Sequence, residues 1–366
     1  MMAATSDMTE ELLVERHGAA CHVLLNRAKA LNALSVAMKA RLAVELPKLA
    51  KDAEIYAVIL KSANPGAFCA GGDVKELTNL ASTGLQAAHQ ALADEYRLNW
   101  FLECFFKPTV ALIDGAVMGS GVGLVQYGTH IVAGENYRFA MPETAIGFFP
   151  DVGVAHRLAR LPHSVGVYLA LTGRTIDRAD AYGLGLVTHC IDVENFGAIE
   201  EELADAEPID PVLDNRHQSP GEGELSAHHG TIARVFSKPT LEDIFAALGD
   251  DSAANAEAER DWCKQVTGEL RQKSPLALKV SLQHVRRAGQ QDLRQTLIAD
   301  YHLACRFLET ADFREGVRAL LVDKTKDPNW QHGEVNEVTD TEVQSYFEPG
   351  DEAAFLLPTK EQIEFK

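Results

Sequence analysis

Short β-type runs alternate with helical patterns through the first half of the chain, and this alternation limits the fold more than any other feature. The run YAVILKS at 56–62 is largely apolar, as expected for a strand that is buried on both faces of a sheet. A helical pattern at 35–52 precedes it, and a longer one at 84–106 separates it from the next run, PTVALID at 108–114. Strands separated by helices need crossover connections, so the sequence predicts an α/β fold.

The remaining chain adds strands, then helices, and one polar stretch. Further strands are expected at 21–27, 129–134, 137–142 and 186–192. Helical patterns dominate beyond residue 150. Residues 200–230 are polar, acidic and carry Pro and Gly, which is typical of a linker or a surface excursion.

The chain is strongly acidic, with a formal net charge of −19 over 366 residues. Its field opposes binding to nucleic acid and to anionic membranes, so neither is expected as a partner. No run approaches the roughly 18 continuous apolar residues of a membrane helix. The six cysteines lack C-x-x-C spacing and the N-terminal segment lacks a signal pattern, so we expect reduced thiols and a cytoplasmic location.

Two glycine-rich loops each follow an expected strand and precede a helical pattern. They are PGAFCAGGDVKEL at 65–77 and DGAVMGSGVGL at 114–124. Neither has the spacing of a P-loop or of a Rossmann first turn. Either loop alone could be a tight turn that packs a helix on a sheet. Together they could supply one backbone N–H each to an oxyanion hole.

The segment FAMPETAIGFFPDVG at 139–153 carries two carboxylates, Glu143 and Asp151, in an otherwise apolar or small-residue stretch. A buried carboxylate is unfavourable unless it is paired or hydrogen-bonded. Structural roles are available, because Glu143 could begin a helix after Pro142 and Asp151 could cap the next helix. These roles are compatible with catalysis, so both acids are candidate catalytic residues.

In combination, these motifs resemble the crotonase (enoyl-CoA hydratase/isomerase) superfamily. The matching pieces are NRAKALNALS (26–35), AFCAGGDVKEL (67–77), DGAVMGSGVGL (114–124), FAMPETAIGFFPDVG (139–153) and LTGRTIDRADAYGLGLVTHCI (171–191). Within the superfamily, MPETAIGFFPDVG, the helix DEYRLNW (94–100) and the stretch at 274–330 are similar to the 3-hydroxyisobutyryl-CoA hydrolase branch.

The resemblance implies an α/β fold, a crotonase-like spiral of ββα turns with a helical C-terminal region. The implied parts are a spiral core with an acyl-CoA site at 10–195, a polar excursion or linker at 196–240, helices that cover the site at 241–330, and an acidic tail at 331–366. Family members hold the thioester oxygen between two backbone N–H groups, which by position belong to Ala70 and Ser120. Family members commonly have Gly where Ser120 stands. Gly71, Gly72 and Asp73 are expected to contact the substrate as well.

One position separates hydration from hydrolysis. By resemblance, hydratases use a glutamate that matches Glu143 and a second one where this chain has Gly123. Adding water across a C=C bond needs an acid and a base at adjacent carbons, so the missing acid favours thioester hydrolysis. Glu143 is then expected to act as nucleophile or general base. Asp151 would orient water or a substrate hydroxyl, and Glu95 would hydrogen-bond that hydroxyl.

CoA carries several negative charges, so basic residues beside the site are expected to bind it. The candidates are Arg27, Lys29 and Lys75. CoA enters as part of the substrate, and no metal ion or redox cofactor is expected. Cys69 lies in the first loop without a visible partner base, and we expect a packed residue rather than a nucleophile.

The resemblance therefore predicts a hydrolase that cleaves 3-hydroxyisobutyryl-CoA, or a related short 3-hydroxyacyl-CoA, in valine breakdown. The alternatives are a hydratase or isomerase of the same fold and a non-catalytic acyl-CoA-binding protein. The oligomeric state is left open: the superfamily favours trimers and their dimers, so a homo-oligomer is possible, and the longer C-terminal part of this branch is a reason for a different state.

Overall fold

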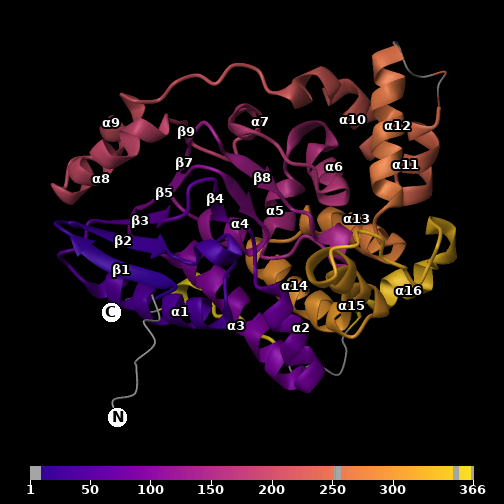
Figure 1. The fold of residues 1–366 in the computed structure, drawn as a ribbon, viewed down its shortest axis with the longest axis horizontal. Helices are drawn as coiled ribbons and strands as arrows, with labels where there is room; N and C mark the ends of the chain where they lie inside the picture. The colour runs from indigo at the N-terminus through magenta and orange to yellow at the C-terminus, as the bar shows by residue number, and fades with distance from the viewer. Residues whose placement is uncertain (1–9, 251, 253–256, 349–353, 364–366) are drawn as a thin grey trace.

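Two sheets organise the fold in the computed structural model, which describes residues 10–250, 252, 257–348 and 354–363 (Figure 1). The larger sheet has the order β1 (Leu12–His17), β2 (Ala20–Leu25), β3 (Ala57–Ser62), β5 (Thr109–Ile113), β7 (His130–Ala133) and β9 (His189–Cys190). Its β1–β2 pair is antiparallel and its other pairs are parallel. The smaller sheet is parallel and contains β4 (Ala67–Cys69), β6 (Ala116–Met118) and β8 (Arg138–Ala140).

The chain alternates between the two sheets and then enters helices, which confirms the predicted spiral of ββα turns. The pair β3–β4 leads to α2 (Val74–Thr83) and α3 (Leu85–Cys104), and β5–β6 leads to α4 (Ser120–Val125). The pair β7–β8 leads to η2 (Glu143–Ile146), α5 (Val154–Leu158), α6 (Val165–Thr172) and α7 (Arg178–Gly183). Each turn therefore delivers a loop to the edge where β4, β6 and β8 end.

The first helix begins where the sequence predicts. Ser35 caps α1 (Val36–Lys51), because its side chain accepts a hydrogen bond from the Met38 N–H at 3.2 Å. The sequence did not predict β1, whose residues LLVERH are half polar and largely accessible to solvent, and which pairs with β2 at the edge of the sheet.

The stretch at 196–240 is not simply a polar excursion, and that prediction is wrong for its first part. It contains α8 (Phe196–Ala204), α9 (Ile209–Asp214), η5 (Glu224–His228) and α10 (His229–Phe236). Ile199, Leu203 and Leu213 are buried with Ile59 and Val110 in one hydrophobic cluster, so α8 and α9 cover a face of the larger sheet. The longest piece of this stretch without helix or strand is 215–223, along the extended connection to η5 and α10 (Figure 1).

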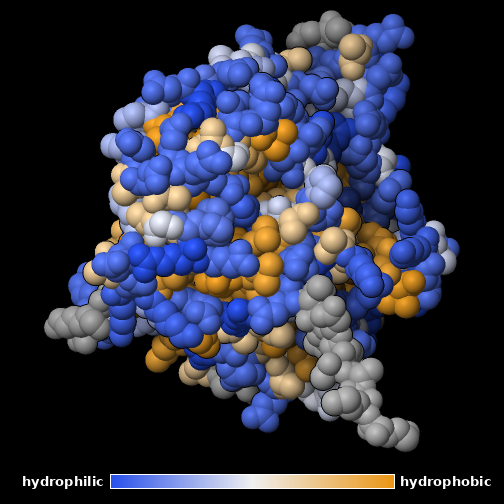
Figure 2. Space-filling model, turned by 60° about the vertical axis from the view of Figure 1, so that its left-hand side comes forward, coloured by the Kyte–Doolittle hydropathy of each residue, from blue (hydrophilic) through white to orange (hydrophobic). Residues whose placement is uncertain are grey.

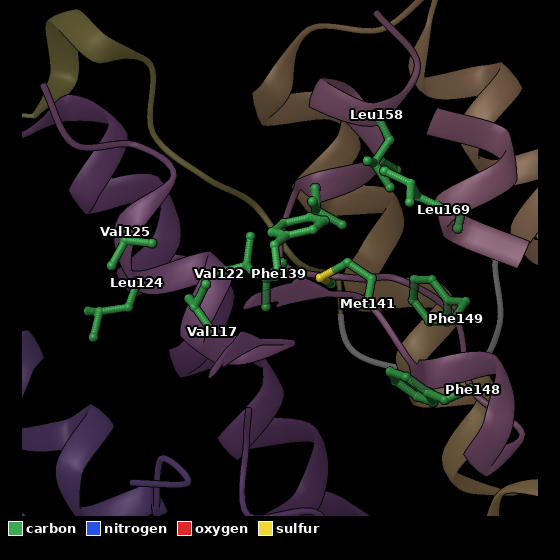
Figure 3. Packing of buried hydrophobic residues seen from close by; sticks show 14 of the residues in the cluster. Val117, Val122, Leu124, Val125, Phe139, Met141, Phe148, Phe149, Leu158 and Leu169 are labelled. Atoms are coloured by element: carbon green, nitrogen blue, oxygen red, sulfur yellow. The ribbon is translucent and has the colours of Figure 1, made fainter. Parts of the chain in front are cut away.

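The C-terminal region is helical, as predicted, and shares the core of the spiral. Its elements are α11 (Leu241–Leu248), α12 (Glu257–Arg271), α13 (Pro275–Ala288), α14 (Leu293–Leu308), α15 (Ala311–Val317), η7 (Arg318–Val322), η8 (Val335–Glu337), α16 (Asp340–Ser345) and η9 (Lys360–Gln362). Helix α14 packs on α3, and α13 packs on α5 and α6. The rings of Phe148 and Phe149 lie beside each other in this core (Figure 3), and both rings also contact Phe307 of α14.

The described part of the predicted acidic tail is partly apolar and packed. Phe355 and Leu357 are buried, and the Phe355 ring stacks on Tyr301 of α14 with ring centroids 4.5 Å apart. Residues 349–353 and 364–366 lie outside the described residues.

The surface of the molecule in Figure 2 is mostly hydrophilic, with hydrophobic residues visible in furrows between hydrophilic ones. None of the described helices combines the length and the apolar character needed to cross a membrane.

Candidate active site

A cavity of about 600 Å³ opens between the two glycine-rich loops, the segment that carries both acids, and the C-terminal helices. The predicted site residues that line it are Lys29, Ala70, Gly71, Gly72, Asp73, Glu95, Ser120, Glu143 and Asp151. Apolar residues form much of the remaining wall, including Leu92, Ile146, Phe148, Phe313 and Leu321. Residues far apart in the sequence are therefore brought to one largely apolar pocket, which is typical of a small-molecule site.

The first glycine loop offers a different N–H group from the one predicted. The Ala70 N–H already donates to Leu31 O at 3.0 Å, so the assignment of Ala70 as an oxyanion donor is wrong. The N–H of Gly72 makes no hydrogen bond to any described residue. A Cβ added to Gly72 would lie 2.8 Å from Ser120 Oγ, so this residue faces the second loop.

The second loop brings its own free N–H to the same place. Gly119 has φ +48°, a conformation that favours glycine, and it precedes Ser120 at the start of α4. The Ser120 N–H, like that of Gly72, makes no hydrogen bond to a described residue. Two unpaired backbone N–H groups from facing loops are the kind of donors that form an oxyanion hole for a carbonyl oxygen.

Glu143 lies against this pair of loops. It is 7% exposed and begins η2 directly after Pro142, so it is the helix-start carboxylate that the sequence allowed. A Cβ added to Gly119 would lie 2.9 Å from Glu143 Oε1, and Oε2 is buried without a hydrogen-bond partner among the described residues. Burial raises the pKa of Glu143 to about 8, although its own backbone N–H and Lys273 act in the opposite direction.

Asp151 forms the second acidic group and is also 7% exposed. Its Oδ2 accepts a hydrogen bond from the Tyr96 hydroxyl at 2.8 Å. Burial raises the pKa of Asp151 well above its usual value, and the nearby carboxylates of Glu95 and Glu143 raise it further. The expected cap is not formed by this side chain, because Gly153 is the N-cap of α5 and no side chain caps that helix.

Glu95 enters the cavity from α3 and is held by a lysine that the sequence did not identify. Lys39 Nζ on α1 donates to Glu95 Oε2 at 2.7 Å, and both side chains are largely buried and line the cavity. A buried charge needs a partner, and here the two helices supply one to each other. The pair offers a hydroxyl group both a hydrogen-bond acceptor and a donor.

The space around Gly123 is closed. A Cβ added there would lie 2.7 Å from Val152 Cβ and 3.0 Å from Asn99 Nδ2. Real Cβ contacts of this length essentially do not occur, so even alanine would need its neighbours to move. The chain lacks the second hydratase acid and also lacks the room for one.

Arg27 does not line the cavity, and its predicted contact with CoA is not supported. Its guanidinium pairs with Glu11 Oε1 and with Asp73 Oδ2, each at 2.8 Å. Asp73 also caps α2 by accepting from the Glu76 N–H at 3.0 Å. The exposed cations that do line the cavity are Lys29, Lys75 and Lys324.

Cys69 is a packed residue, as expected. It is fully buried behind the first loop, its Sγ lies 3.1 Å from Asn32 O, and burial raises the pKa of its thiol to about 12. A thiol with this pKa stays protonated at neutral pH and is a poor nucleophile. Among the described residues, no cluster of three or more His, Cys, Asp or Glu side chains is arranged to hold a metal ion.

Comparisons with known proteins identify the family and the fold of the chain. The enoyl-CoA hydratase/isomerase family profile matches residues 20–347. The 3-hydroxyisobutyryl-CoA hydrolase, mitochondrial, of Rattus norvegicus is 38% identical over 349 residues, covering 93% of this chain and 89% of the rat protein.

Two solved structures share the fold over nearly the whole chain. A carnitinyl-CoA dehydratase from Mycobacterium thermoresistibile has a TM-score of 0.87 and 35% identity, covering 94% of this chain and 98% of that one. An enoyl-CoA hydratase from Rhodobacter sphaeroides has a TM-score of 0.84 and 34% identity, covering 93% and 98%.

Proposed function

The chain belongs to the enoyl-CoA hydratase/isomerase family, and on that premise we propose that it hydrolyses the thioester of 3-hydroxyisobutyryl-CoA or of a related short 3-hydroxyacyl-CoA. One observation carries the proposal. Two unpaired backbone N–H groups and two buried carboxylates share one cavity, while Gly123 leaves no room for a second hydratase acid. The similarity to the rat 3-hydroxyisobutyryl-CoA hydrolase supports the same activity.

In the proposed reaction the thioester carbonyl oxygen accepts hydrogen bonds from the N–H groups of Gly72 and Ser120. These donors stabilise the negative charge that develops on this oxygen as the carbonyl carbon becomes tetrahedral. Oxygen from water ends on that carbon, the C–S bond breaks, and the CoA sulfur leaves and takes up a proton. The donors come from two facing loops and need no reorganisation during the reaction.

Glu143 carries the central carboxylate chemistry in this proposal. It could attack the carbonyl carbon and form a mixed anhydride that water then hydrolyses, or it could remove a proton from the attacking water. Repeated turnover in ¹⁸O-water detects an anhydride that water opens at the Glu143 carbonyl, because ¹⁸O then enters the Glu143 carboxyl group and mass spectrometry of the peptide shows it. An anhydride opened at the acyl carbonyl leaves Glu143 unlabelled, as the general-base route does, and hydroxylamine trapping of the acyl-enzyme separates these two.

We assign recognition of the acyl group to two side-chain pairs. Glu95 and Lys39 would bind the 3-hydroxyl, because together they offer it an acceptor and a donor. Asp151, held by Tyr96, would orient the attacking water or share the same hydroxyl. The apolar wall would contact the branched carbon chain and exclude bulk water.

Lys29, Lys75 and Lys324 are proposed to bind the phosphates of CoA, since all three are exposed and line the cavity. The chain has a net charge of −19, so its overall field repels an anionic substrate, and a local cluster of lysines would offset this repulsion at the cavity. Carboxylates and backbone amides supply the proposed chemistry, so it calls for no metal ion or redox cofactor.

A hydratase or dehydratase is the second candidate, because the two structural neighbours are a carnitinyl-CoA dehydratase and an enoyl-CoA hydratase. Loss of the enone absorbance of crotonyl-CoA measures hydration directly. We expect hydration to be much slower than hydrolysis, since Gly123 leaves the reaction with one acid in place of two. Hydration as fast as thioester cleavage would favour the second candidate.

A thiol-trapping assay with 3-hydroxyisobutyryl-CoA tests the proposed function. Glu143→Gln should lower kcat by about 10²-fold or more if its carboxylate acts as base or nucleophile. Asp180→Asn is a matched control, because Asp180 is also buried but lies outside the cavity. Binding of acyl-CoA without thiol release by the folded wild type would indicate the non-catalytic alternative.

The proposed activity bears on the metabolic step, the cellular compartment and the oligomeric state. The acyl group suggests a step in valine breakdown, which accumulation of the substrate in a deletion strain would test. No disulfide joins the described cysteines, which suits a reducing compartment such as the cytoplasm, and cell fractionation would test this. A homo-oligomer is one possible state by family analogy, and light scattering after gel filtration measures the state.

A further inference from the structure

The turn at 151–153 that carries Asp151 has a strained backbone. Val152 has φ +53°, in the left-handed region that a β-branched residue rarely adopts. Gly153 follows with φ +74°, and a Cβ there would lie 2.4 Å from Tyr127 Oη and 2.8 Å from Leu293 Cδ1. Such a conformation persists only where the surrounding structure holds it.

Two hydrogen bonds from within the spiral hold one side of this turn. Val152 O accepts from Gln126 Nε2 at 2.7 Å and from Tyr127 Oη at 2.5 Å. Both donors follow α4, the helix that begins at the second glycine loop. The turn is thereby tied to the loop that supplies the Ser120 N–H.

The C-terminal helices hold the other side through a buried carboxylate. Gly153 donates its N–H to Asp300 Oδ2 at 2.6 Å. The second oxygen, Oδ1, lies 2.6 Å from Nε2 of His284. Asp300 on α14 is 0% exposed and His284 on α13 is 1% exposed, so water does not compete for either bond.

Packing fixes the orientation of the imidazole as well. The His284 ring meets the Phe149 ring edge to face, with centroids 5.4 Å apart and an interplanar angle of 90°. Phe149 belongs to the same segment as both acids. Phe149 therefore packs against His284, and His284 bonds Asp300. Asp300 in turn accepts the N–H of Gly153, two residues after Asp151.

A carboxylate buried only to join two helices would bond to groups of those helices. Asp300 does so with one oxygen, which bonds His284 of α13, but its other oxygen accepts a single backbone N–H from the strained turn, outside both helices. We propose that His284 and Asp300 are positioning residues, which hold the turn at 151–153 so that the Asp151 carboxylate stays aligned with the bound thioester. The role in catalysis rests on the proposed thioester hydrolysis.

Two substitutions of Asp300 separate positioning from simple stability. Asp300→Ala removes both hydrogen bonds, and we expect kcat to fall roughly 10- to 100-fold while KM changes little, as for a displaced catalytic group. Asp300→Asn can keep both bonds, because its carbonyl accepts from Gly153 and its NH₂ donates to the other tautomer of His284. We therefore expect Asp300→Asn to recover most of the lost kcat.

Asp180→Ala is the matched control. Asp180 is also buried and accepts a backbone N–H, that of Leu225 at 3.0 Å, but lies outside the cavity. It should lower the unfolding temperature without lowering kcat of the folded fraction. His284→Phe keeps a ring against Phe149 but removes the hydrogen bond to Asp300. Its loss of kcat should lie between those of Asp300→Asn and Asp300→Ala.

Hydrogen exchange at the Gly153 amide reads the anchor directly and needs no turnover. We expect its protection to fall in Asp300→Ala and to persist in Asp300→Asn and Asp180→Ala. Equal exchange in wild type and Asp300→Ala, or equal loss of kcat in Asp300→Ala and Asp300→Asn, would overturn the proposal. Absence of thioester hydrolysis by the wild type would instead refute the proposed function, and exchange would still show whether Asp300 anchors the turn.

Discussion

Gly123 lies directly against Val152, so closely that a Cβ on Gly123 would approach Val152 Cβ to 2.7 Å. This contact links the missing acid to the strained turn beside Asp151, since Val152 occupies space that a side chain at 123 would need. The arrangement that excludes the second hydratase acid is therefore built into the packing of the site.

A first prediction follows for Gly123→Glu. Restoring the acid should not create a hydratase, because the larger side chain must displace Val152 and with it the turn that carries Asp151. Overpacking of this kind typically costs about 1–3 kcal/mol or more of stability. Thermal unfolding should shift to lower temperature, and crotonyl-CoA hydration should stay at background. Efficient hydration by a stably folded variant would show that the site tolerates the acid.

The second prediction concerns the pH dependence of the reaction. Burial raises the pKa of Glu143 to about 8, and both proposed routes need its ionised carboxylate. The value of kcat/KM, which reports the free enzyme, should therefore rise with pH and level off above about pH 8. A profile that is already flat from pH 6 would contradict a role for ionised Glu143.

The same pKa shift predicts how stability depends on pH. The pKa of Glu143 is raised from 4.5 to about 8 in the folded protein, so between these values the unfolded chain loses the proton that the folded chain keeps. Unfolding then releases a proton, and the contribution of Glu143 to stability falls as pH rises through this window. Glu143→Gln lacks this titration. Its stability relative to wild type should increase by a few kcal/mol between about pH 5 and pH 8, measured by urea unfolding.

Much of the fold was predictable because the buried strands have local signatures. The apolar run that forms β3 and the Ser35 cap of α1 are both explicit in the sequence. The strand β1 was missed because its last three residues, Glu15, Arg16 and His17, are polar and exposed at a sheet edge. The helix α8 was missed because an acidic composition masked the spacing of Ile199 and Leu203, which face the sheet.

In the site, the acids and loops were predictable, and their partners were not. Which N–H of the first loop is free depends on Leu31 O, which bonds to Ala70 from a distant part of the chain. Lys39 and Tyr96 are ordinary residues of helical patterns until the fold brings them to Glu95 and Asp151. Such pairings arise from helix packing and have no local pattern in the sequence.

The third prediction tests recognition of the acyl hydroxyl through Lys39→Met. The change keeps the length and the apolar stem of the side chain. It removes the ammonium group, which leaves the Glu95 carboxylate without its partner. We expect preference for 3-hydroxyisobutyryl-CoA over isobutyryl-CoA, measured as the ratio of kcat/KM values, to fall about 10-fold or more, because a buried polar pair no longer matches the hydroxyl. Breaking such a buried pair should also lower stability by about 3–5 kcal/mol.

The control for Lys39 is Lys48→Met on the same helix. Lys48 is exposed and pairs with Glu45 at 3.0 Å, and neither residue lines the cavity. Its loss should alter neither the selectivity nor, by more than about 1 kcal/mol, the stability. An unchanged selectivity ratio in folded Lys39→Met would remove Lys39 and Glu95 from hydroxyl recognition.

The fourth prediction tests whether the two glycine loops act together as the oxyanion hole. In Gly72→Ala the new Cβ would lie 2.8 Å from Ser120 Oγ, so the Ser120 side chain must rotate or one loop must shift relative to the other. If the loops shift, kcat should fall about 10²-fold, as when one oxyanion donor is misaligned, with little change in KM, whereas rotation of Ser120 alone should leave kcat near the wild-type value. Because the obstructing atom belongs to the side chain of Ser120, Ser120→Gly should relieve the contact and restore much of the lost kcat in the double variant. The single variant Ser120→Gly retains its backbone N–H and should stay near wild-type activity. Additive losses in the double variant, measured as a double-mutant cycle on kcat, would show that these loops do not share one function.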